Sequence, residues 1–367
     1  MKTIVSLTLL ALLAAVIILP ISGEHATAQE PTGPQGAAPP PKGTPPPAPA
    51  TQQQQAPAPQ AGVSIAVTVP VVTLDVIAAT QNGDLLTGLK KENFKVVDDG
   101  VTQTITNFGP TDAPITIVML MEFSSRGLYE WFAYQAKYWA DAFLPNLKQN
   151  DWVALRTFDM NTHDEVDFTQ NKDEVRNALY RLYFPGFSES NVFDAVLKTI
   201  DDMRDVRGKK SILLMATGVD TFSKHTWDQT IKQLRQSDVT IFCVGLDKPY
   251  TNFLDLHGSM SPHMSYLQGE NQMKNIASLT GGYAWFPQFD GELPGIFQTV
   301  AAFLRHQYSL SYTPTGTPND NKFHKVKIEL VNPDGSPLEI HNQKGKKQKW
   351  VVYAREGYDP QKSSNGD

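Results

Sequence analysis

Cysteine is nearly absent from this sequence, since Cys243 is the only one among 367 residues. No internal disulfide can form, so the folded part must be stabilised by its own apolar core, for which the chain is long enough. Cys243 lies in the apolar run VTIFCVG. This setting predicts a small buried side chain rather than a reactive thiol.

An excess of positive charge is also missing. Lys and Arg total 32 against 38 Asp and Glu, which gives a net charge of −6. The densest basic cluster, KGKKQK at Lys344–Lys349, is typical of a solvated hairpin loop. This balance argues against nucleic acid or an anionic membrane surface as the main partner.

Motifs for catalysis are missing as well. The sequence has no glycine-rich phosphate loop, no GxSxG elbow and no HExxH helix. No nucleophile, base and orienting group can be named for a hydrolase. We therefore expect a protein without enzymatic activity.

The N-terminal residues are typical of an export signal. Lys2 precedes an apolar stretch from Ile4 to about Ile21, and the small residues ATA end at Ala28. This pattern predicts a signal peptide over residues 1–28 and a secreted, periplasmic or cell-envelope location. The apolar stretch is also long enough for an uncleaved anchor, the one arrangement that would make a membrane a partner.

A low-complexity segment follows the predicted signal. Residues 29–62 are mostly Pro, Ala and Gln. They can bury too little apolar surface to offset the entropy of ordering, so we expect a disordered, extended linker. A tether of this kind suggests reach across a cell envelope, and the alternative is a simple spacer with no partner of its own. Residues 359–367 are expected to form a disordered tail.

Two β-rich segments, residues 63–110 and 308–358, flank the middle of the chain. In the first, Asp99-Gly100 is a strong hairpin signal between two alternating runs. Each segment alone is too short to bury a good core. We therefore predict that both pack into one smaller all-β, sandwich-like domain, with residues 111–307 inserted between them.

Apolar strands alternate with amphipathic helices over residues 111–307. The continuous run ITIVMLM is typical of a strand buried on both faces. The alternation predicts a Rossmann-like α/β fold with a doubly wound, mostly parallel sheet. The expected strands are 115–121, 151–158, 211–217, 239–245 and 283–287; the expected helices are 128–147, 171–182, 191–208, 226–237, 271–282 and 293–307.

The loop after ITIVMLM carries Glu122, Ser124, Ser125 and Arg126. Ligands of open α/β sheets bind at such carboxyl ends of strands. The acid-x-Ser pattern here, with the later segments SNVFDAVL and LLMATGVD, resembles a von Willebrand factor A domain. The flanking GLKKENFKVVDDGVTQTITNF and YSLSYTPTG resemble the VWFA-related secreted proteins found widely in acidobacteria. The resemblance extends from Ser64 to Tyr358.

The resemblance implies a metal-ion-dependent adhesion site. Family members with an intact site carry Asp-x-Ser-x-Ser on a first loop, Thr on a second and Asp on a third, and these oxygens hold Mg²⁺. In this chain Glu122 replaces the Asp, Ser124 matches the first Ser, and Arg126 replaces the second Ser. Ser190 stands at the Thr position, and Thr217 stands where the final Asp belongs.

Charge argues against a metal at this site. A guanidinium about 4 Å from Mg²⁺ would cost roughly 8 kcal/mol at an effective dielectric near 20. We therefore expect no metal and no other cofactor, with Arg126 replacing the ion and pairing with Glu122. Arg126 could instead turn to solvent and leave an empty polar loop. If Mg²⁺ does bind, its ligands are Glu122, Ser124 and Ser190. Asp220 could reach back toward the site, but not from the expected position.

Two further loops carry residue types found in metal sites. The segment Asp159–Glu165 (DMNTHDE) lacks the glycine of a calcium loop and is predicted to be a β-hairpin tip. Asp255, His257 and His263 would need a further ligand for zinc. We expect a mobile surface loop there that could contact a partner.

These observations predict an exported, non-catalytic protein-binding module of adhesion or scaffold type, with a degenerate metal-adhesion site. A protein partner would dock on the loops that carry Glu122, Ser124, Ser125, Arg126, Ser190, Thr217 and Asp220. Exposed aromatics at Tyr129, Trp131 and Tyr138 could add to that surface, although amphipathic packing also explains them. The alternatives are a structural or assembly component of the envelope with the A domain as scaffold, and an A domain that still binds Mg²⁺ and a carboxylate ligand.

Overall fold

The computed structural model describes most of the chain beyond residue 70. The described ranges are 71–81, 83–110, 114–124, 142–182, 187–245, 260–315, 322–342 and 344–359. The predicted signal peptide, the linker, most of the helix expected at 128–147 and nearly all of the tail lie outside these ranges. Within them, no helix is both long and apolar enough to cross a membrane.

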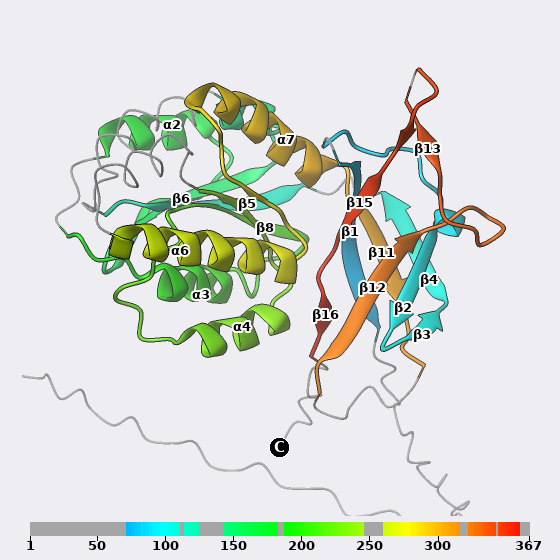
Figure 1. Cartoon of the computed structure of the whole chain (residues 1–367). Helices are drawn as coiled ribbons and strands as arrows, with labels where there is room; N and C mark the ends of the chain where they lie inside the picture. The colour runs from blue at the N-terminus through cyan, green and yellow to red at the C-terminus, as the bar shows by residue number, and fades with distance from the viewer. Residues whose placement is uncertain are drawn as a thin grey trace, which may run out of the picture. The chain divides into compact units, whose positions relative to one another are not determined.

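A six-stranded sheet forms the centre of the α/β domain, in the order β10-β9-β8-β5-β6-β7 (Figure 1). Its strands are β5 (Ile115–Glu122), β6 (Trp152–Phe158), β7 (Thr162–Thr169), β8 (Lys209–Met215), β9 (Thr240–Val244) and β10 (Ala284–Trp285). Neighbouring strands are parallel, except that β7 runs antiparallel to β6. The predicted doubly wound, mostly parallel sheet is confirmed.

Helices cover both faces of this sheet, as Figure 1 shows. They are α2 (Lys172–Arg181) and α7 (Leu293–Arg305) on one face, and α3 (Val192–Asp202), α4 (Trp227–Gln236) and α6 (Met260–Leu279) on the other. Every residue of β5 is buried, as an unbroken apolar run requires in a strand covered on both sides. On α7, Phe297, Val300 and Leu304 recur at helical spacing and face the core.

One helix ends earlier than its sequence predicts. Helix α3 ends at Asp202, well before the expected stop at Gly208. Met203 is fully buried in the turn that follows, which leads the chain toward β8. Gly208 has a positive φ of 90° and serves the entry into that strand instead of the helix end.

Another helix begins earlier than predicted. Helix α6 begins at Met260, so His263 lies in a helix and not in the expected mobile loop. Pro262 is compatible with this start because proline is tolerated in the first turn of a helix. Asp255 and His257 lie outside the described residues.

Both flanking segments contribute to two four-stranded antiparallel sheets, with orders β15-β1-β11-β4 and β16-β12-β2-β3. Their strands are β1 (Val72–Thr80), β2 (Phe94–Asp98), β3 (Val101–Gln103), β4 (Ile105–Pro110), β11 (Tyr308–Tyr312), β12 (His324–Leu330), β15 (Trp350–Tyr353) and β16 (Gly357–Tyr358). Leu74 of β1 is paired with Leu310 of β11. Side chains of both sheets, Leu74 and Val96 among them, share one apolar core. The predicted sandwich-like domain of both segments is confirmed.

Short elements complete the fold. They are the hairpin β13 (Ile340–His341) and β14 (Lys347–Gln348), with the 3-10 helices η1 (Lys91–Asn93), η2 (Leu144–Asn146) and η3 (Asp290–Glu292). Asp99 and Gly100 join β2 to β3 with φ values of 45° and 85°, the two positive values that a type I′ turn needs.

The segment Asp159–Glu165 lies at the tip of the β6–β7 hairpin, as predicted. Cys243 is fully buried, and burial raises the pKa of its thiol.

A buried carboxylate fixes the edge of the sheet at which β5 begins. Asp151 is 0% exposed and accepts hydrogen bonds from the Ile115 amide at 3.0 Å and the Lys148 amide at 2.7 Å. It also forms an ion pair with Arg305 at the end of α7. Burial acts to raise the pKa of Asp151, but the Arg305 and amide hydrogen bonds more than offset this and hold the pKa below its usual value.

The first prediction concerns this carboxylate. Asp151→Ala leaves the Arg305 charge and two amides unpaired, so we expect the free energy of unfolding at pH 7 to fall by about 3–5 kcal/mol. The lowered pKa means that the wild-type contribution is present above the ordinary value of 3.8 and is lost as the pH falls through the folded value. Urea unfolding at pH 7 and pH 3 measures both effects.

An exposed ion pair provides the control for Asp151. Asp201, whose side chain is 60% exposed, pairs with Arg204, and Asp201→Ala should cost less than about 1 kcal/mol because solvent screens exposed pairs. Equal losses in the two variants would contradict a structural role for Asp151.

Candidate functional site

Three loops meet at the carboxyl-terminal edge of the central sheet. Glu122 is the last residue of β5, and Thr217 follows β8 by two positions. Strands β5 and β8 are parallel neighbours in which Met121 is paired with Met215. Their ends therefore bring Glu122 and Thr217 together. Ser190 comes from the second loop along the chain, which leads into α3.

Hydroxyl and amide donors hold the Glu122 carboxylate. The Thr217 amide and hydroxyl both donate to Oε2, over 2.7 and 2.8 Å. The Ser124 hydroxyl donates to Oε1 over 3.1 Å. Thr217 Oγ1 in turn accepts a hydrogen bond from the Val219 amide at 3.0 Å. The hydroxyl that serves Glu122 is therefore fixed in orientation by its own loop.

Four buried side chains meet here, and we call them the Glu122 cluster: Glu122, Ser124, Ser190 and Thr217. Their exposed fractions are 2%, 2%, 1% and 6%, respectively. Burial raises the pKa of Glu122, while Thr217, Ser124 and Ser190 oppose the rise by favouring the charged form. The Ser190 hydroxyl has no hydrogen-bond geometry to any described residue. The hydroxyl nevertheless lies near enough to Glu122 to favour its charged form.

A close contact with α6 fixes the Thr217 loop. Gly218 has a φ of 76°, and a Cβ added there would lie 2.4 Å from the carbonyl oxygen of Gly269 in α6. A Cβ at Gly269 would lie 2.7 Å from the carbonyl oxygen of Thr217. Neither position can carry a side chain without displacing backbone. This pair of glycines therefore determines how near α6 approaches the Glu122 cluster.

Asp220 serves the start of α3 rather than Glu122. Its carboxylate accepts hydrogen bonds from the Phe193 amide at 3.4 Å and from the Ser223 amide and hydroxyl. Burial raises the pKa of Asp220, and these donors oppose the rise. A carboxylate at the N-terminus of a helix satisfies an amide that has no partner within the helix. Asp220 thus joins the loop that follows β8 to the start of α3.

Sequence reasoning missed a second acid with a similar role. Asp194, in the first turn of α3, accepts hydrogen bonds from the Lys224 amide at 2.9 Å and the His225 amide at 3.1 Å. The His225 ring lies 2.7 Å from the same carboxylate. The hydrogen bonds from His225 and Lys224 outweigh burial and hold the pKa of Asp194 below its usual value. An acid in the first turn of a predicted helix is the signal that could have found it.

The described residues do not fit a resident Mg²⁺ ion. Mg²⁺ requires near-octahedral oxygen ligands and is usually held by one or two carboxylates with several waters. Here Thr217 stands at the place of the second carboxylate and donates both its amide and its hydroxyl to the first. Both oxygens of Glu122 are engaged by protein donors. Ser125 and Arg126, which the sequence also assigns to this site, lie outside the described residues, as do Tyr129, Trp131 and Tyr138.

Comparison with protein families agrees with this architecture. Residues 91–279, just over half of the chain, match the model of the von Willebrand factor type A domain. The chain therefore belongs to the von Willebrand factor type A domain family. No curated protein matches the sequence.

Several solved structures are similar to parts of the chain. One is a von Willebrand factor type A structure from Catenulispora acidiphila, with a TM-score of 0.41 and 12% identity over 77% of this chain and 73% of that one. Another is the conserved hypothetical protein BatB from Bacteroides thetaiotaomicron, with a TM-score of 0.38 and 12% identity over 52% and 98%. A third is the vWF domain of the type V pili tip protein Mfa5 from Porphyromonas gingivalis, with a TM-score of 0.39 and 12% identity over 52% and 95%.

The second prediction separates the charge of Glu122 from its hydrogen bonds. Glu122→Ala leaves the donors of Thr217 and Ser124 unpaired, so we expect a loss of about 2–4 kcal/mol in the free energy of unfolding. Glu122→Gln keeps an oxygen that can accept from Thr217 and should lie within about 1 kcal/mol of the wild type at pH 7.

The pH dependence gives the matching control. The raised pKa of Glu122 means that folding favours the protonated form. Its stabilisation is therefore fully present below the ordinary value of 4.5 and is lost as the pH rises through the folded value. The stability of the wild type relative to Glu122→Gln should fall from pH 4 to pH 8 in urea titrations. Parallel curves for the two proteins would show that Glu122 does not titrate as described.

Proposed function

We propose that this protein is an exported, non-catalytic protein-binding module of adhesion or scaffold type, and that its metal-ion-dependent adhesion site is degenerate. The Glu122 cluster carries this proposal. At the edge where the resemblance implies a metal ion, Thr217 supplies two hydrogen-bond donors in place of a carboxylate. Partner binding would then depend on the surrounding loops and not on a metal-bound carboxylate.

The charge of the first loop supports the same proposal. Arg126 adds a permanent cation four residues after Glu122. A guanidinium supplies five donors and no acceptor, so it cannot serve as a metal ligand. It can instead present a fixed positive charge to an acidic group of a protein partner.

Exposed aromatic side chains beside the cluster supply a contact surface. Phe222 is 48% exposed, and its amide donates to the Ser190 carbonyl oxygen at 3.0 Å. Phe187 precedes Ser190 in the same loop and is 47% exposed. Aromatic residues are enriched at protein interfaces, where burying their area contributes much of the binding free energy. We therefore assign Phe187 and Phe222 to the docking surface and expect a protein as the partner.

Absence of catalysis is part of the proposal. Among the described residues, only hydroxyl and amide groups donate hydrogen bonds to Glu122. Both oxygens of this buried carboxylate are engaged by these donors, which makes it poorly placed to accept a proton from a substrate. The cluster is better suited to fixing the shape of its loops than to moving a proton.

The terminal segments complete the proposal. Residues 1–28 would direct export, and residues 29–62 would tether the folded part, in agreement with a secreted, periplasmic or cell-envelope location. The flanking motifs favour membership of the VWFA-related secreted proteins of acidobacterial type. The β domain of residues 63–110 and 308–358 would then carry the A domain of residues 111–307 on the tether.

The third prediction tests docking directly. Phe222→Ala should weaken binding of the protein partner by about tenfold or more, because it removes a large apolar side chain from the contact surface. Partners are first identified by cross-linking in an envelope extract of the native host. Affinity is then measured calorimetrically with the purified partner, in EDTA and in Mg²⁺, and should be equal in the two solutions.

Trp152 supplies the matched control. It is 42% exposed and begins β6, so it lies at the opposite edge of the sheet from Glu122. Trp152→Ala should leave the affinity unchanged. Loss of partner binding in EDTA that Mg²⁺ restores would contradict a metal-free site, and equal affinities for wild type and Phe222→Ala would place docking elsewhere.

A further inference from the structure

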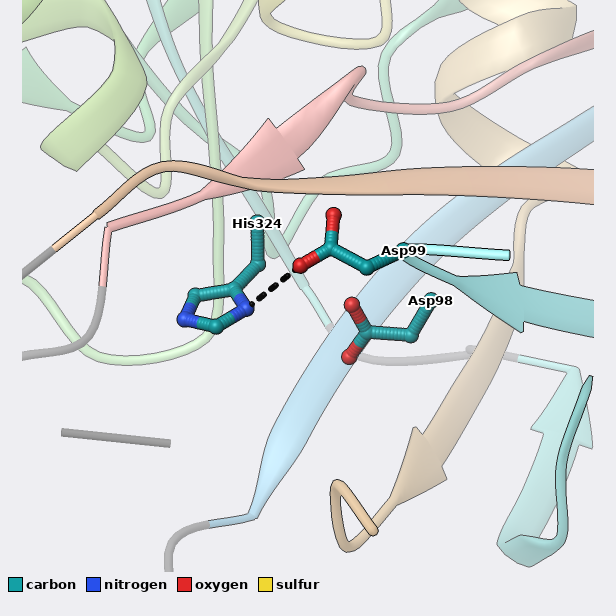
Figure 2. Close-up of side chains that lie close together, drawn as sticks. All are labelled: Asp98, Asp99 and His324. Carbon is teal, nitrogen blue, oxygen red and sulfur yellow. Dashed lines mark hydrogen bonds and ion pairs between the residues drawn. The ribbon is translucent and has the colours of Figure 1, made fainter. Parts of the chain in front are cut away.

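A second group of ligand-type side chains lies in the β domain, apart from the Glu122 cluster. Asp98 ends β2, Asp99 opens the type I′ turn, and His324 begins β12. Figure 2 shows the three side chains gathered around one point. One ligand atom from each lies within 4.8 Å of the other two. His324 Nδ1 lies 2.9 Å from a carboxylate oxygen of Asp99.

Asp98 supplies an independent observation that points to a ligand. Its side chain is 5% exposed, and its Oδ2 accepts hydrogen bonds from the hydroxyls of Tyr312 and Tyr358 at 2.9 and 3.0 Å. Its Oδ1 is buried and has no hydrogen-bond partner among the described residues. A buried carboxylate oxygen without a donor or a cation costs free energy. A cation bound to Oδ1 would remove that cost.

Contacts within the β domain already fix the orientation of the Asp99 and His324 side chains. The Asp99 amide donates to the Lys325 carbonyl oxygen, and the Lys325 amide donates back to Asp99 Oδ1, both at 2.9 Å. The His324 ring stacks on Tyr358 with centroids 5.2 Å apart. Partners of this kind fix the direction of a metal ligand and raise the affinity of a site.

Distances within the group suit a single small cation. Two ligands that each lie about 2.1 Å from one ion are about 3.4 Å apart when they meet at the tetrahedral angle that Zn²⁺ prefers. His324 Nδ1 and Asp99 Oδ2 are 2.9 Å apart, so a separation by about 0.5 Å would let both hold one ion. An oxygen of Asp98 would complete the set, since the three ligand atoms lie within 4.8 Å of one another.

We propose that Asp98, Asp99 and His324 bind a divalent transition-metal ion, with Zn²⁺ as the reference. Two carboxylate oxygens and an imidazole nitrogen suit Zn²⁺, whereas Mg²⁺ and Ca²⁺ prefer oxygen ligands alone. Two carboxylates beside a neutral imidazole supply the charge of −2 that balances the ion. Three protein ligands leave one position for water. The ion joins the β2–β3 turn to β12 and stabilises this sheet.

Metal titration of the purified full chain tests the proposal. After treatment with a chelator and its removal, Zn²⁺ should bind with a stoichiometry of one in calorimetry. Co²⁺ should give the visible absorption of a site with nitrogen and oxygen ligands. The thermal midpoint should rise by about 5 °C or more when Zn²⁺ is present at 100 times its Kd. Mg²⁺ at millimolar concentration should not displace Zn²⁺.

Variants assign the binding to these residues. Asp98→Asn and His324→Ala should each weaken Zn²⁺ binding at least about 100-fold, because each removes a direct ligand, and Tyr358→Phe by about tenfold, because it removes a partner of Asp98. His341→Ala is the control, since His341 is exposed in the same domain and has no place in the group. It should bind Zn²⁺ like the wild type. Circular dichroism of the metal-free proteins checks folding.

Two results would overturn the proposal of a Zn²⁺ site. Absence of Zn²⁺ binding by the wild type, or unchanged affinity in Asp98→Asn and His324→Ala, contradicts it. If Asp98→Asn fails to fold, Asp99→Asn and His324→Gln decide the question, because neither residue accepts the hydrogen bonds of the Tyr312 and Tyr358 hydroxyls. None of these outcomes bears on partner docking near Glu122, which Phe222→Ala tests separately.

Discussion

The stabilisation of one buried carboxylate, Glu122, organises the carboxyl-terminal edge of the central sheet. Burial raises the pKa of this side chain, and donors from Thr217 and Ser124 compensate for lost contact with water. That compensation requires Thr217 to lie beside the end of β5, which the parallel pairing of β5 with β8 provides. The Gly218–Gly269 contact then sets the approach of α6. Strand register, loop position and charge are therefore linked at this edge.

The internal hydrogen bonds of Glu122 affect whether this edge of the sheet can hold a metal ion. A metal-centred site uses carboxylates to hold a cation and leaves a coordination position open to the partner. In this chain both oxygens of the Glu122 carboxylate accept hydrogen bonds from protein donors, and the four side chains of the Glu122 cluster are buried. What remains available near the edge is loop surface, including Phe222 and Phe187. Asp220 and Asp194 accept backbone hydrogen bonds that join those loops to the start of α3, so contacts within the chain fix the backbone beside the Glu122 cluster.

Periodicity and turn chemistry were sufficient to predict much of the fold. The ITIVMLM run, the alternating helices and the Asp99-Gly100 turn each have a local physical cause, and the described residues contain the strand, the turn and five of the six expected helices. The role of Thr217 was not predictable in the same way. The sequence identifies it as a missing ligand, whereas its function as a donor to Glu122 depends on strand register. His324 and Asp99 are 225 positions apart, so only the paired sheets of the β domain reveal that they meet. The early start of α6 was missed because Pro262 and neighbouring polar residues are typical of a loop.

The most direct test of the central claim is calorimetric titration of the protein with Mg²⁺ at neutral pH, compared with Glu122→Ala. The account predicts no binding heat for either protein at millimolar Mg²⁺, because Thr217 occupies the place of the second carboxylate and Glu122 is already held by protein donors. A one-to-one isotherm for the wild type that is lost in Glu122→Ala would contradict the account. The protein would then be a metal-dependent adhesion module of the usual kind.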